Sequence, residues 1–415
     1  MAGAAVAGGS LLASCGTSGA GGGGGLEIFS WWTSGGEVEA LNALFDVYRS
    51  RHPEVEIVNA AVAGGGGAGA NMKAILQTRV LGNDPPDSFQ VHLGAELIET
   101  WVEVGTMEPL DSLYQEEGYA KVLPASLIEI ASWEAKPYGV PVNIHRNNVL
   151  WYNKPLMDQV GGTPPATWDE FFALAEKAKG QGIPAIGMAE ANGNTTAHLV
   201  EALLLAKLGA DGYTGLFDGT TPWDSPEVTE ALETAVRCFP YANQDYLSYQ
   251  GSDAPKLISD GKALTLINGD WTNGLLKQQG FTDYGWVPAP ETDGVYDLVS
   301  DSFGLPMGLD DPTDATNWLK VIGSKEGHDA FNPLKGSISP RSDRDTSRYD
   351  EYQLWAVEQW DGAPSIVPSL EDGSAAGPRF LAAFDDTMHK FDVNQDPAAT
   401  QAELVRAAAD ADFRK

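Results

Sequence analysis

Apolar residues change their spacing near the start of the chain. Residues 26–30 and 55–60 are short apolar stretches of the kind that form strands. Between them, residues 37–51 repeat apolar side chains at helical spacing. The positions on that helical face are Val38, Leu41, Leu44, Phe45 and Tyr48. This order predicts a βαβ unit whose two parallel strands are joined by a right-handed crossover.

The same alternation continues after a Gly-rich turn at residues 64–69. Residues 71–81 have a helical pattern, the Asp-Pro-Pro-Asp stretch at 84–87 breaks it, and residues 88–92 read as a third strand. Repeated alternation of strands and helices is typical of α/β folds. We therefore predict an α/β sheet for the first part of the chain.

A second region of the same character opens near residues 138–143. Capping boxes of the Ser/Thr-x-x-Glu type stand at residues 34–37 and 167–170 and predict two helix starts. Further helices are predicted over 198–208 and 226–238, and further strands over 263–267 and 284–287. No internal repeat of about 20–50 residues is present, which argues against a solenoid or a propeller.

Length and composition indicate a soluble globular protein of two or three domains. The chain has 415 residues, of which 43% are hydrophobic and 20% charged. Its 58 Asp and Glu against 26 Lys and Arg give a formal net charge of −32. Such a surface repels phosphate backbones, so no nucleic-acid partner is expected. The carboxylates are spread along the whole chain, which predicts a solvated acidic surface, and adaptation to high salt is one hypothesis for it.

The first 25 residues have the composition of a signal remnant followed by a tether. No stretch reaches the roughly 18 apolar residues of a membrane helix. Leu12-Ala-Ser-Cys15 resembles a lipobox, and residues 16–25 are mostly Gly. We therefore expect a lipid anchor on Cys15, although the missing basic n-region leaves open a late start codon or an accidental match. Cys238, in a helical pattern, is then expected to be a buried free thiol.

Candidate binding side chains stand at the ends of two predicted strands. Trp31 and Trp32 follow the first strand, and Gln90 and His92 end the third. Because ligands of open α/β sheets bind outside the carboxyl ends of the strands, these four side chains are expected at one edge. Indole faces stack on the C–H face of a sugar, while amide and imidazole groups bond its hydroxyls. The alternative is that one or both tryptophans belong to the core, and Glu37 is equally explained by its capping box.

Other chemistries have less support in the sequence. The Gly run at 64–70 lacks the Gly-Lys-Ser/Thr ending of a phosphate loop, and no Rossmann glycine pattern follows a strand. The six histidines have no metal-binding spacing, and no Gly-x-Ser-x-Gly elbow occurs. We therefore expect no cofactor and no metal. A pair of glycosidase carboxylates stays open as an alternative, because carboxylates are abundant.

Seven stretches together resemble the extracellular sugar-binding proteins of ABC importers, and among these the glucose- and galactose-binding members. They occur in family order over nearly everything after residue 26. The stretches are 27–32 (EIFSWW), 85–92 (PPDSFQVH), 138–146 (YGVPVNIHR), 165–171 (PATWDEF), 268–271 (NGDW), 300–306 (SDSFGLP), and 323–327 (GSKEG) with 331–336 (FNPLKG).

The resemblance implies a two-lobed, hinge-closing α/β fold like that of periplasmic binding proteins. The chain would cross between the lobes near 138–142, 300–306 and 337–341. The expected division is residues 1–25 for the signal remnant, lipobox and tether, 26–138 plus 303–338 for lobe 1, and 139–302 plus 339–415 for lobe 2.

The resemblance also implies a set of sugar contacts. They are Trp31, Trp32, Glu37, Gln90, His92, Asn143, Asp270, Trp271, Asp301, Lys335 and Asp372. Two departures from the family pattern affect sugar choice: relatives carry a His where this chain has Asp372, and an aromatic in the segment matching 191–194.

The sequence therefore predicts a monomeric binding protein that is extracellular or periplasmic. Its expected partners are a monosaccharide such as glucose or galactose and an ABC permease, and it would contact the membrane only through the lipid on Cys15. The rival interpretations are a secreted glycoside hydrolase and a surface carbohydrate-interaction protein.

Overall fold

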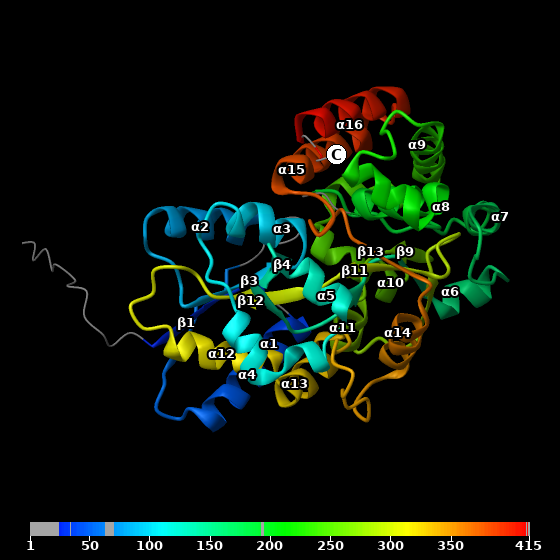
Figure 1. The fold of residues 1–415 in the computed structure, drawn as a ribbon. Coiled ribbons are helices and arrows are strands. Elements are labelled where there is room, and N and C mark those ends of the chain that lie inside the picture. Colours follow the sequence, from blue (N-terminus) through cyan, green and yellow to red (C-terminus); the bar gives the residue numbers. More distant parts are fainter. Residues whose placement is uncertain (1–24, 34, 63–69, 192–194, 412, 414–415) are drawn as a thin grey trace, which may run out of the picture.

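The computed structural model describes residues 25–33, 35–62, 70–191, 195–411 and 413. Figure 1 shows two groups of elements, one at the lower left and one at the upper right. The predicted lipobox with Cys15, the Gly-rich turn, Ser34 of the first capping box and residues 192–194 lie outside the described residues.

Lobe 1 is built on a five-stranded sheet with the order β2-β1-β3-β12-β6. The strands are β1 (Leu26–Phe29), β2 (Ile57–Asn59), β3 (Ser88–His92), β6 (Gly139–Pro141) and β12 (Asp301–Gly304). β1 is parallel to β2 and β3, which confirms the parallel pair predicted at the start of the chain. β12 is antiparallel to β3 and β6.

Helices cover both faces of this sheet because apolar residues on its strands alternate between the faces. Ile28 packs toward α1, α12 and α13, whereas Phe29 and Phe89 pack toward α2 and α3. The elements of this lobe are α1 (Gly35–Arg51), α2 (Ala70–Leu81), α3 (Ala95–Leu97) running into a π-helical turn (Ile98–Val102), α4 (Asp111–Glu117), α5 (Ala125–Ile130), the hairpin of β4 (Ser132–Trp133) and β5 (Lys136–Pro137), α12 (Thr313–Gly323) and α13 (Lys325–Lys335).

Lobe 2 contains two three-stranded sheets, β10-β8-β9 and β13-β11-β7. The strands are β7 (His145–Arg146), β8 (Val149–Asn153), β9 (Thr265–Ile267), β10 (Tyr284–Pro288), β11 (Val295–Val299) and β13 (Ser365–Pro368). β8 lies between two antiparallel neighbours and is almost wholly apolar, as expected of a strand in the middle of a buried sheet.

Nine α-helices surround these sheets within the described residues. They are α6 (Lys154–Gln159), α7 (Trp168–Lys179), α8 (Thr195–Asp218), α9 (Pro226–Cys238), α10 (Ala254–Ser259), α11 (Trp271–Gln278), α14 (Glu351–Gly362), α15 (Pro378–Asn394) and α16 (Pro397–Ala411). The predicted capping box at Thr167 and Glu170 is present. α8 continues past the predicted end at residue 208 through a kink at Gly209, where φ is 67°. Cys238 is a buried free thiol, as predicted.

The chain passes between the lobes three times. After β6 it reaches β7 through residues 142–144, and it returns through Ser300, which separates β11 from β12. The third passage follows α13, where Ile338 forms a bridge with Ile144. β6 and the whole of β12 pair within the first sheet, whereas the expected ranges 26–138 and 303–338 for lobe 1 leave out residues 139–141 and 301–302.

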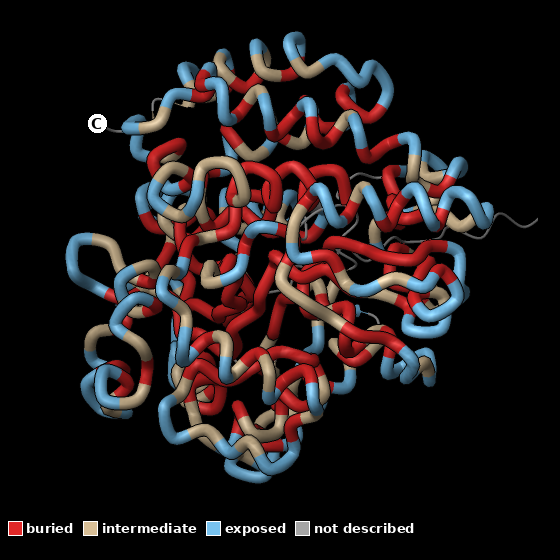
Figure 2. Tube along the Cα trace, turned by 90° about the vertical axis from the view of Figure 1, so that its right-hand side faces the viewer, coloured by how far each residue is buried: buried red, intermediate tan, exposed pale blue. Residues whose placement is uncertain are grey.

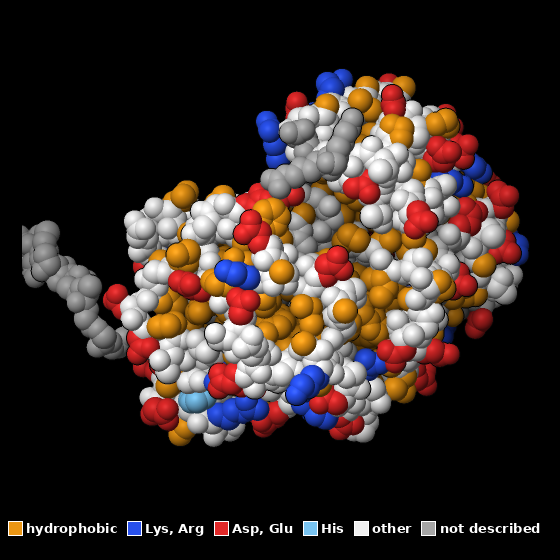
Figure 3. Space-filling view, viewed as in Figure 1, with side chains coloured by type: hydrophobic (Ala, Val, Ile, Leu, Met, Phe, Trp, Pro, Cys, Tyr) orange, Lys and Arg blue, Asp and Glu red, His pale blue; other side chains and the backbone are white. Residues whose placement is uncertain are grey.

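Burial separates the interior from the surface cleanly. Figure 2 shows buried residues concentrated in the middle of the molecule and exposed ones at its periphery. On the face drawn in Figure 3, acidic side chains are scattered over both lobes rather than gathered in one patch. Within the part of the chain that the structure describes, no helix combines the length and apolar composition that crossing a bilayer requires.

Candidate functional site: a buried charge network between the lobes

Asp301, the first residue of β12, is the centre of a buried hydrogen-bond network. Its Oδ1 accepts from Gln90 Nε2 at 2.6 Å, and its Oδ2 accepts from Asn143 Nδ2 at 2.7 Å. The Asp301 backbone N–H in turn donates to Asn143 Oδ1 at 2.8 Å. The Asp301 side chain is only 3% exposed. A buried carboxylate needs several donors, and here they come from β3 and from the first passage between the lobes.

Strand register explains why these residues meet. In the antiparallel pair of β3 and β12, Asp301 lies opposite His92, and Gln90 lies opposite Phe303. Gln90 and His92 are two residues apart and therefore share a face of β3. The prediction that the ends of the first and third strands converge is confirmed, since the Trp31 N–H donates to Gln90 Oε1 at 3.1 Å.

Two buried histidines flank Asp301. His92 Nε2 lies 3.5 Å and His145 Nε2 3.4 Å from the Asp301 carboxylate. Burial alone would lower the pKa of His92, but bonding to Asp301 and Glu96 outweighs it and raises the pKa to about 10. Burial also opposes ionisation of Asp301, yet the two histidines hold its pKa well below the usual range. At neutral pH His92 is therefore an imidazolium group beside the Asp301 carboxylate.

A second carboxylate extends the network through His145. Its Nδ1 bonds to the carboxylate of Asp270, the residue before α11, and the Arg146 N–H donates to Asp270 Oδ2 at 3.1 Å. Burial would lower the pKa of His145, but Asp270 and Asp301 together outweigh it and raise the pKa. Asp270 is fully buried.

Lys335, at the end of α13, supplies a third cation. Its Nζ lies 2.8 Å from Glu37 Oε1. Burial would lower the pKa of Lys335, whereas Glu37 and Asp301 raise it above the ordinary value. Glu37 thus serves as the partner of a buried ammonium group, in the first turn of α1.

The three predicted tryptophans have different environments. Trp31 is half-buried and meets His92 edge to face, with ring centroids 4.9 Å apart. Trp271 is also half-buried, and its ring centroid lies 5.7 Å from that of His145. Trp32 is 1% exposed and packs on Phe303 and Phe331 in the core of lobe 1. Lys335 Nζ lies 5.9 Å from the Trp32 ring centroid.

The loop between β13 and α15 brings Asp372 to the same place. His92 Nδ1 bonds to the Asp372 backbone O at 2.8 Å. The Asp372 carboxylate lies 3.4 Å from Ser369 Oγ and is 6% exposed as a residue. Beyond it, the N–H groups of Ala95 and Glu96 donate to Ser374 O at 2.9 Å and Gly373 O at 3.0 Å. The loop between β13 and α15 of lobe 2 is therefore hydrogen-bonded through its backbone to α3 of lobe 1.

All eleven sequence-predicted residues thus lie in one region around the Asp301 network. Trp32 borders this region from within the core of lobe 1. Sequence reasoning did not nominate several members of the network: His145, His198, Glu371, and the pair Lys73 and Glu96, whose charged atoms are 2.6 Å apart. His145 carried a usable signal, because it stands two residues after Asn143 on an extended segment. His198 and Glu371 carried none, because they meet only through tertiary structure.

The buried carboxyl pair of Asp392 and Glu190 makes the stability of the folded protein depend on pH. Asp392 of α15 accepts from Thr196 Oγ1 at 2.5 Å and lies near Glu190. Burial and the Glu190 carboxylate raise the pKa of Asp392 to about 8. The folded state therefore retains this proton better than the unfolded chain, whose Asp titrates near pH 4. The resulting stability is complete below about pH 4 and is lost as the pH rises through about 8.

Asp392→Asn is accordingly expected to remove part of this pH dependence. The variant should be more stable than the wild type by about 1–2 kcal/mol at pH 8.5, with a smaller difference at pH 5. Urea unfolding at both pH values measures it, with Asp410→Asn on exposed α16 as the control. Equal destabilisation by Asp392→Asn at both values would contradict the raised pKa of Asp392.

Two lobes joined by three passages, with the polar network where they meet, define the solute-binding class of fold. Residues 32–329 match the family of bacterial extracellular solute-binding proteins. The chain is 35% identical, over 92% of its length and 87% of the relative's, to an uncharacterized ABC transporter extracellular-binding protein of Pyrococcus horikoshii. It is 30% identical to a probable sugar-binding periplasmic protein of Mesorhizobium japonicum, covering 93% and 94% of the two chains.

Solved structures agree on the fold. The bacterial solute receptor AcbH, described as preferring β-D-galactopyranose, superposes with a TM-score of 0.83 and 20% identity, covering 94% of this chain and 99% of that one. This protein belongs to the bacterial extracellular solute-binding protein family. It is a binding protein and not an enzyme, which removes the glycoside hydrolase alternative.

Proposed function

We propose that this protein is the sugar-binding component of an ABC importer, and that it captures a monosaccharide such as glucose or galactose between its lobes. The Asp301 network supports this most directly, because it gathers buried donors and acceptors from both lobes beside two half-buried indoles. Neutral sugars present both hydroxyl donors and acceptors, together with an apolar ring face. The delivery partner would be a membrane permease.

Each residue has a role in this proposal. Trp31 and Trp271 stack on the sugar ring, and the hydroxyls bond to Glu37, Gln90, His92, Asn143, Asp270, Asp301, Lys335 and Asp372. Of the paired tryptophans, Trp31 is the better stacking candidate because Trp32 is packed on Phe303 and Phe331. A sugar that touches both lobes binds the closed state better, so it shifts the population toward closure.

Calorimetry against glucose, galactose, xylose, maltose and a neutral polyol tests the proposal. We expect at least one monosaccharide to bind with a Kd on the order of micromolar or tighter, roughly −8 kcal/mol, and to change the intrinsic tryptophan fluorescence. Binding of none of the sugars would contradict the function. Binding of maltose alone would keep the function and exclude the monosaccharide.

The contact between α3 and the loop after β13, which the proposed closure requires, can be tested at Gly94, whose φ is 99°. A Cβ added there would lie 2.3 Å from the backbone O of Ser374 in lobe 2. Gly94→Ala should therefore hinder closure and weaken sugar binding by about 10–100-fold, since affinity falls with the fraction of closed protein. Calorimetry measures it.

Gly105→Ala is the matched control, because Gly105 has a φ of 74° but nothing within 4 Å of an added Cβ. Both variants place an alanine at positive φ, and the strain is greater at Gly94, whose ψ of −143° lies outside the left-handed helical region. An equal loss of affinity in both would attribute the effect to strain and not to closure.

We also propose that the protein acts as a monomer outside the cytoplasm, held to the membrane by a lipid on Cys15. Cys15→Ser should then release it into the culture medium, as an immunoblot of cells and medium would show. An unchanged distribution would argue against the anchor.

A further inference from the structure

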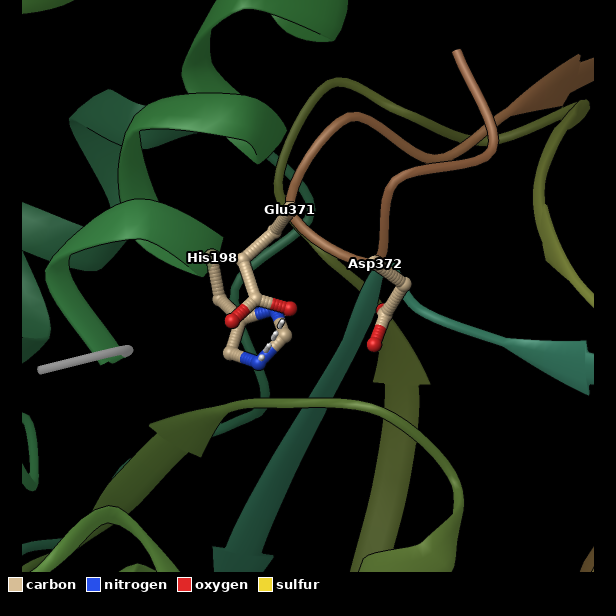
Figure 4. A group of neighbouring side chains, drawn as sticks. All are labelled: His198, Glu371 and Asp372. Atoms are coloured by element: carbon tan, nitrogen blue, oxygen red, sulfur yellow. Dashed lines mark ion pairs between the residues drawn. The ribbon is translucent and has the colours of Figure 1, made fainter. Parts of the chain in front are cut away.

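Two carboxylates and an imidazole meet where the loop after β13 turns against α8. His198 stands in the first turn of α8, and Glu371 and Asp372 are consecutive in the loop. One ligand atom from each lies within 4.8 Å of the others, and the three residues are 2%, 3% and 6% exposed. Figure 4 shows the two carboxylates extending from the loop beside the imidazole.

His198 is the unusual member of this group. Neither of its ring nitrogens has a hydrogen-bond partner, although the residue is almost completely buried. Its Nε2 lies 3.6 Å from Glu371 Oε2. Buried polar groups are nearly always bonded, so an unbonded imidazole facing two carboxylates calls for a ligand.

The surroundings hold these side chains in place and add a third carboxyl group. Glu201, three residues after His198 on α8, accepts from the N–H groups of Leu370 at 2.5 Å and Glu371 at 3.3 Å. It therefore fixes the loop that carries two of the three ligands. Glu201 is itself held by Tyr213 OH at 2.5 Å and Asn147 Nδ2 at 2.9 Å, so the carboxyl groups at this buried turn have fixed positions.

We propose that His198, Glu371 and Asp372 form a binding site for a divalent transition-metal ion of the Zn²⁺ type. One imidazole and two carboxylates are ligands that Zn²⁺ accepts, whereas Ca²⁺ and Mg²⁺ prefer oxygen alone. Tetrahedral bonds of about 2.0–2.1 Å place ligand atoms about 3.4 Å apart. The three atoms, now within 4.8 Å of one another, would have to draw closer around such an ion.

The fourth position of such an ion is left for water or for a bound solute. The ring centroid of Trp271 lies 5.7 Å from that of His198, so the ion would adjoin the proposed sugar site. Asp372 needs only one oxygen for the ion, which leaves the other for a sugar hydroxyl. An ion here would also link the loop to α8. Because it would bind only the folded state, it would raise the unfolding temperature.

The test is Zn²⁺ calorimetry on the full chain after treatment with a chelator. Excess Mg²⁺ and KCl would occupy the acidic surface. We expect one Zn²⁺ per molecule, a higher unfolding temperature with Zn²⁺, and, with Co²⁺ as a substitute, the visible absorption of a four-coordinate site. His198→Gln should weaken Zn²⁺ binding at least about 100-fold, since even outer-shell changes cost 10–100-fold. Glu371→Gln should act similarly, and His389→Gln on an exposed turn of α15 should have no effect.

The outcomes separate this inference from the proposed function. Sugar binding by wild-type protein that takes up no Zn²⁺ would overturn the metal site and leave the sugar function intact. Zn²⁺ binding unchanged in His198→Gln would place the ion elsewhere and also overturn it. Should His198→Gln fail to fold, Glu371→Gln and the Co²⁺ spectrum of the wild type decide the question.

Discussion

Asp301→Ala is expected to abolish measurable sugar binding and to destabilise the protein. The change leaves the side chains of Gln90 and Asn143 without their acceptor, and His92 and His145 without the carboxylate between them. Removing one partner of a buried ion pair costs about 3–5 kcal/mol. Sugar affinity should fall at least about 100-fold, because hydrogen bonds to charged groups contribute about 1.5–3 kcal/mol each.

Urea unfolding and calorimetry measure the two effects of Asp301→Ala. Asp310→Ala is the control, since it removes an aspartate that is exposed to solvent and lies in the same part of the chain. Asp301→Asn adds a third comparison: it keeps the side-chain shape but turns one acceptor into a donor. Full sugar affinity in a stable Asp301→Ala variant would remove Asp301 from the site.

Trp32→Ala should cost about 3–5 kcal/mol of unfolding free energy, the usual price of truncating a buried tryptophan. Trp32 is 1% exposed and contacts two phenylalanines of the lobe 1 core. Trp31→Ala, one residue away, should instead cost little stability and weaken sugar binding by about 1–3 kcal/mol, by analogy with aromatic stacking on flat ligands.

The pair of variants serves as its own control. Urea unfolding and sugar calorimetry on both should give opposite patterns, with stability lost at one position and affinity at the other. If Trp32→Ala kept its stability and lost its affinity, the second indole would be a sugar-stacking residue after all, as the family resemblance implies.

Local periodicity accounts for how much of the fold could be predicted. β3 and α9 have their predicted bounds, 88–92 and 226–238, because each has a clear apolar pattern between breaking residues. β7 and β13 were not predicted. They are two and four residues long, and their hydrogen bonds go to β11, which is distant in the sequence from both.

Some residues of the candidate site could likewise be predicted from the sequence, and others could not. Gln90, His92 and Asn143 could be placed because strand ends and family motifs identify them. The burial of Trp32 could not, because adjacent strand-end residues turn to opposite sides and only the packed sheet decides which one faces Phe303 and Phe331. The meeting of His198 with Glu371 depends on how α8 packs against the loop after β13, which no local pattern encodes.

The three passages also bear on when folding can finish during synthesis. The core of lobe 1 includes Phe331, and that of lobe 2 includes Leu404 and Ala407 of α16. Neither lobe can complete its core until much later segments have emerged, so early folded intermediates lack part of their interior. Each core is therefore completed by residues that are synthesised long after the strands they pack against.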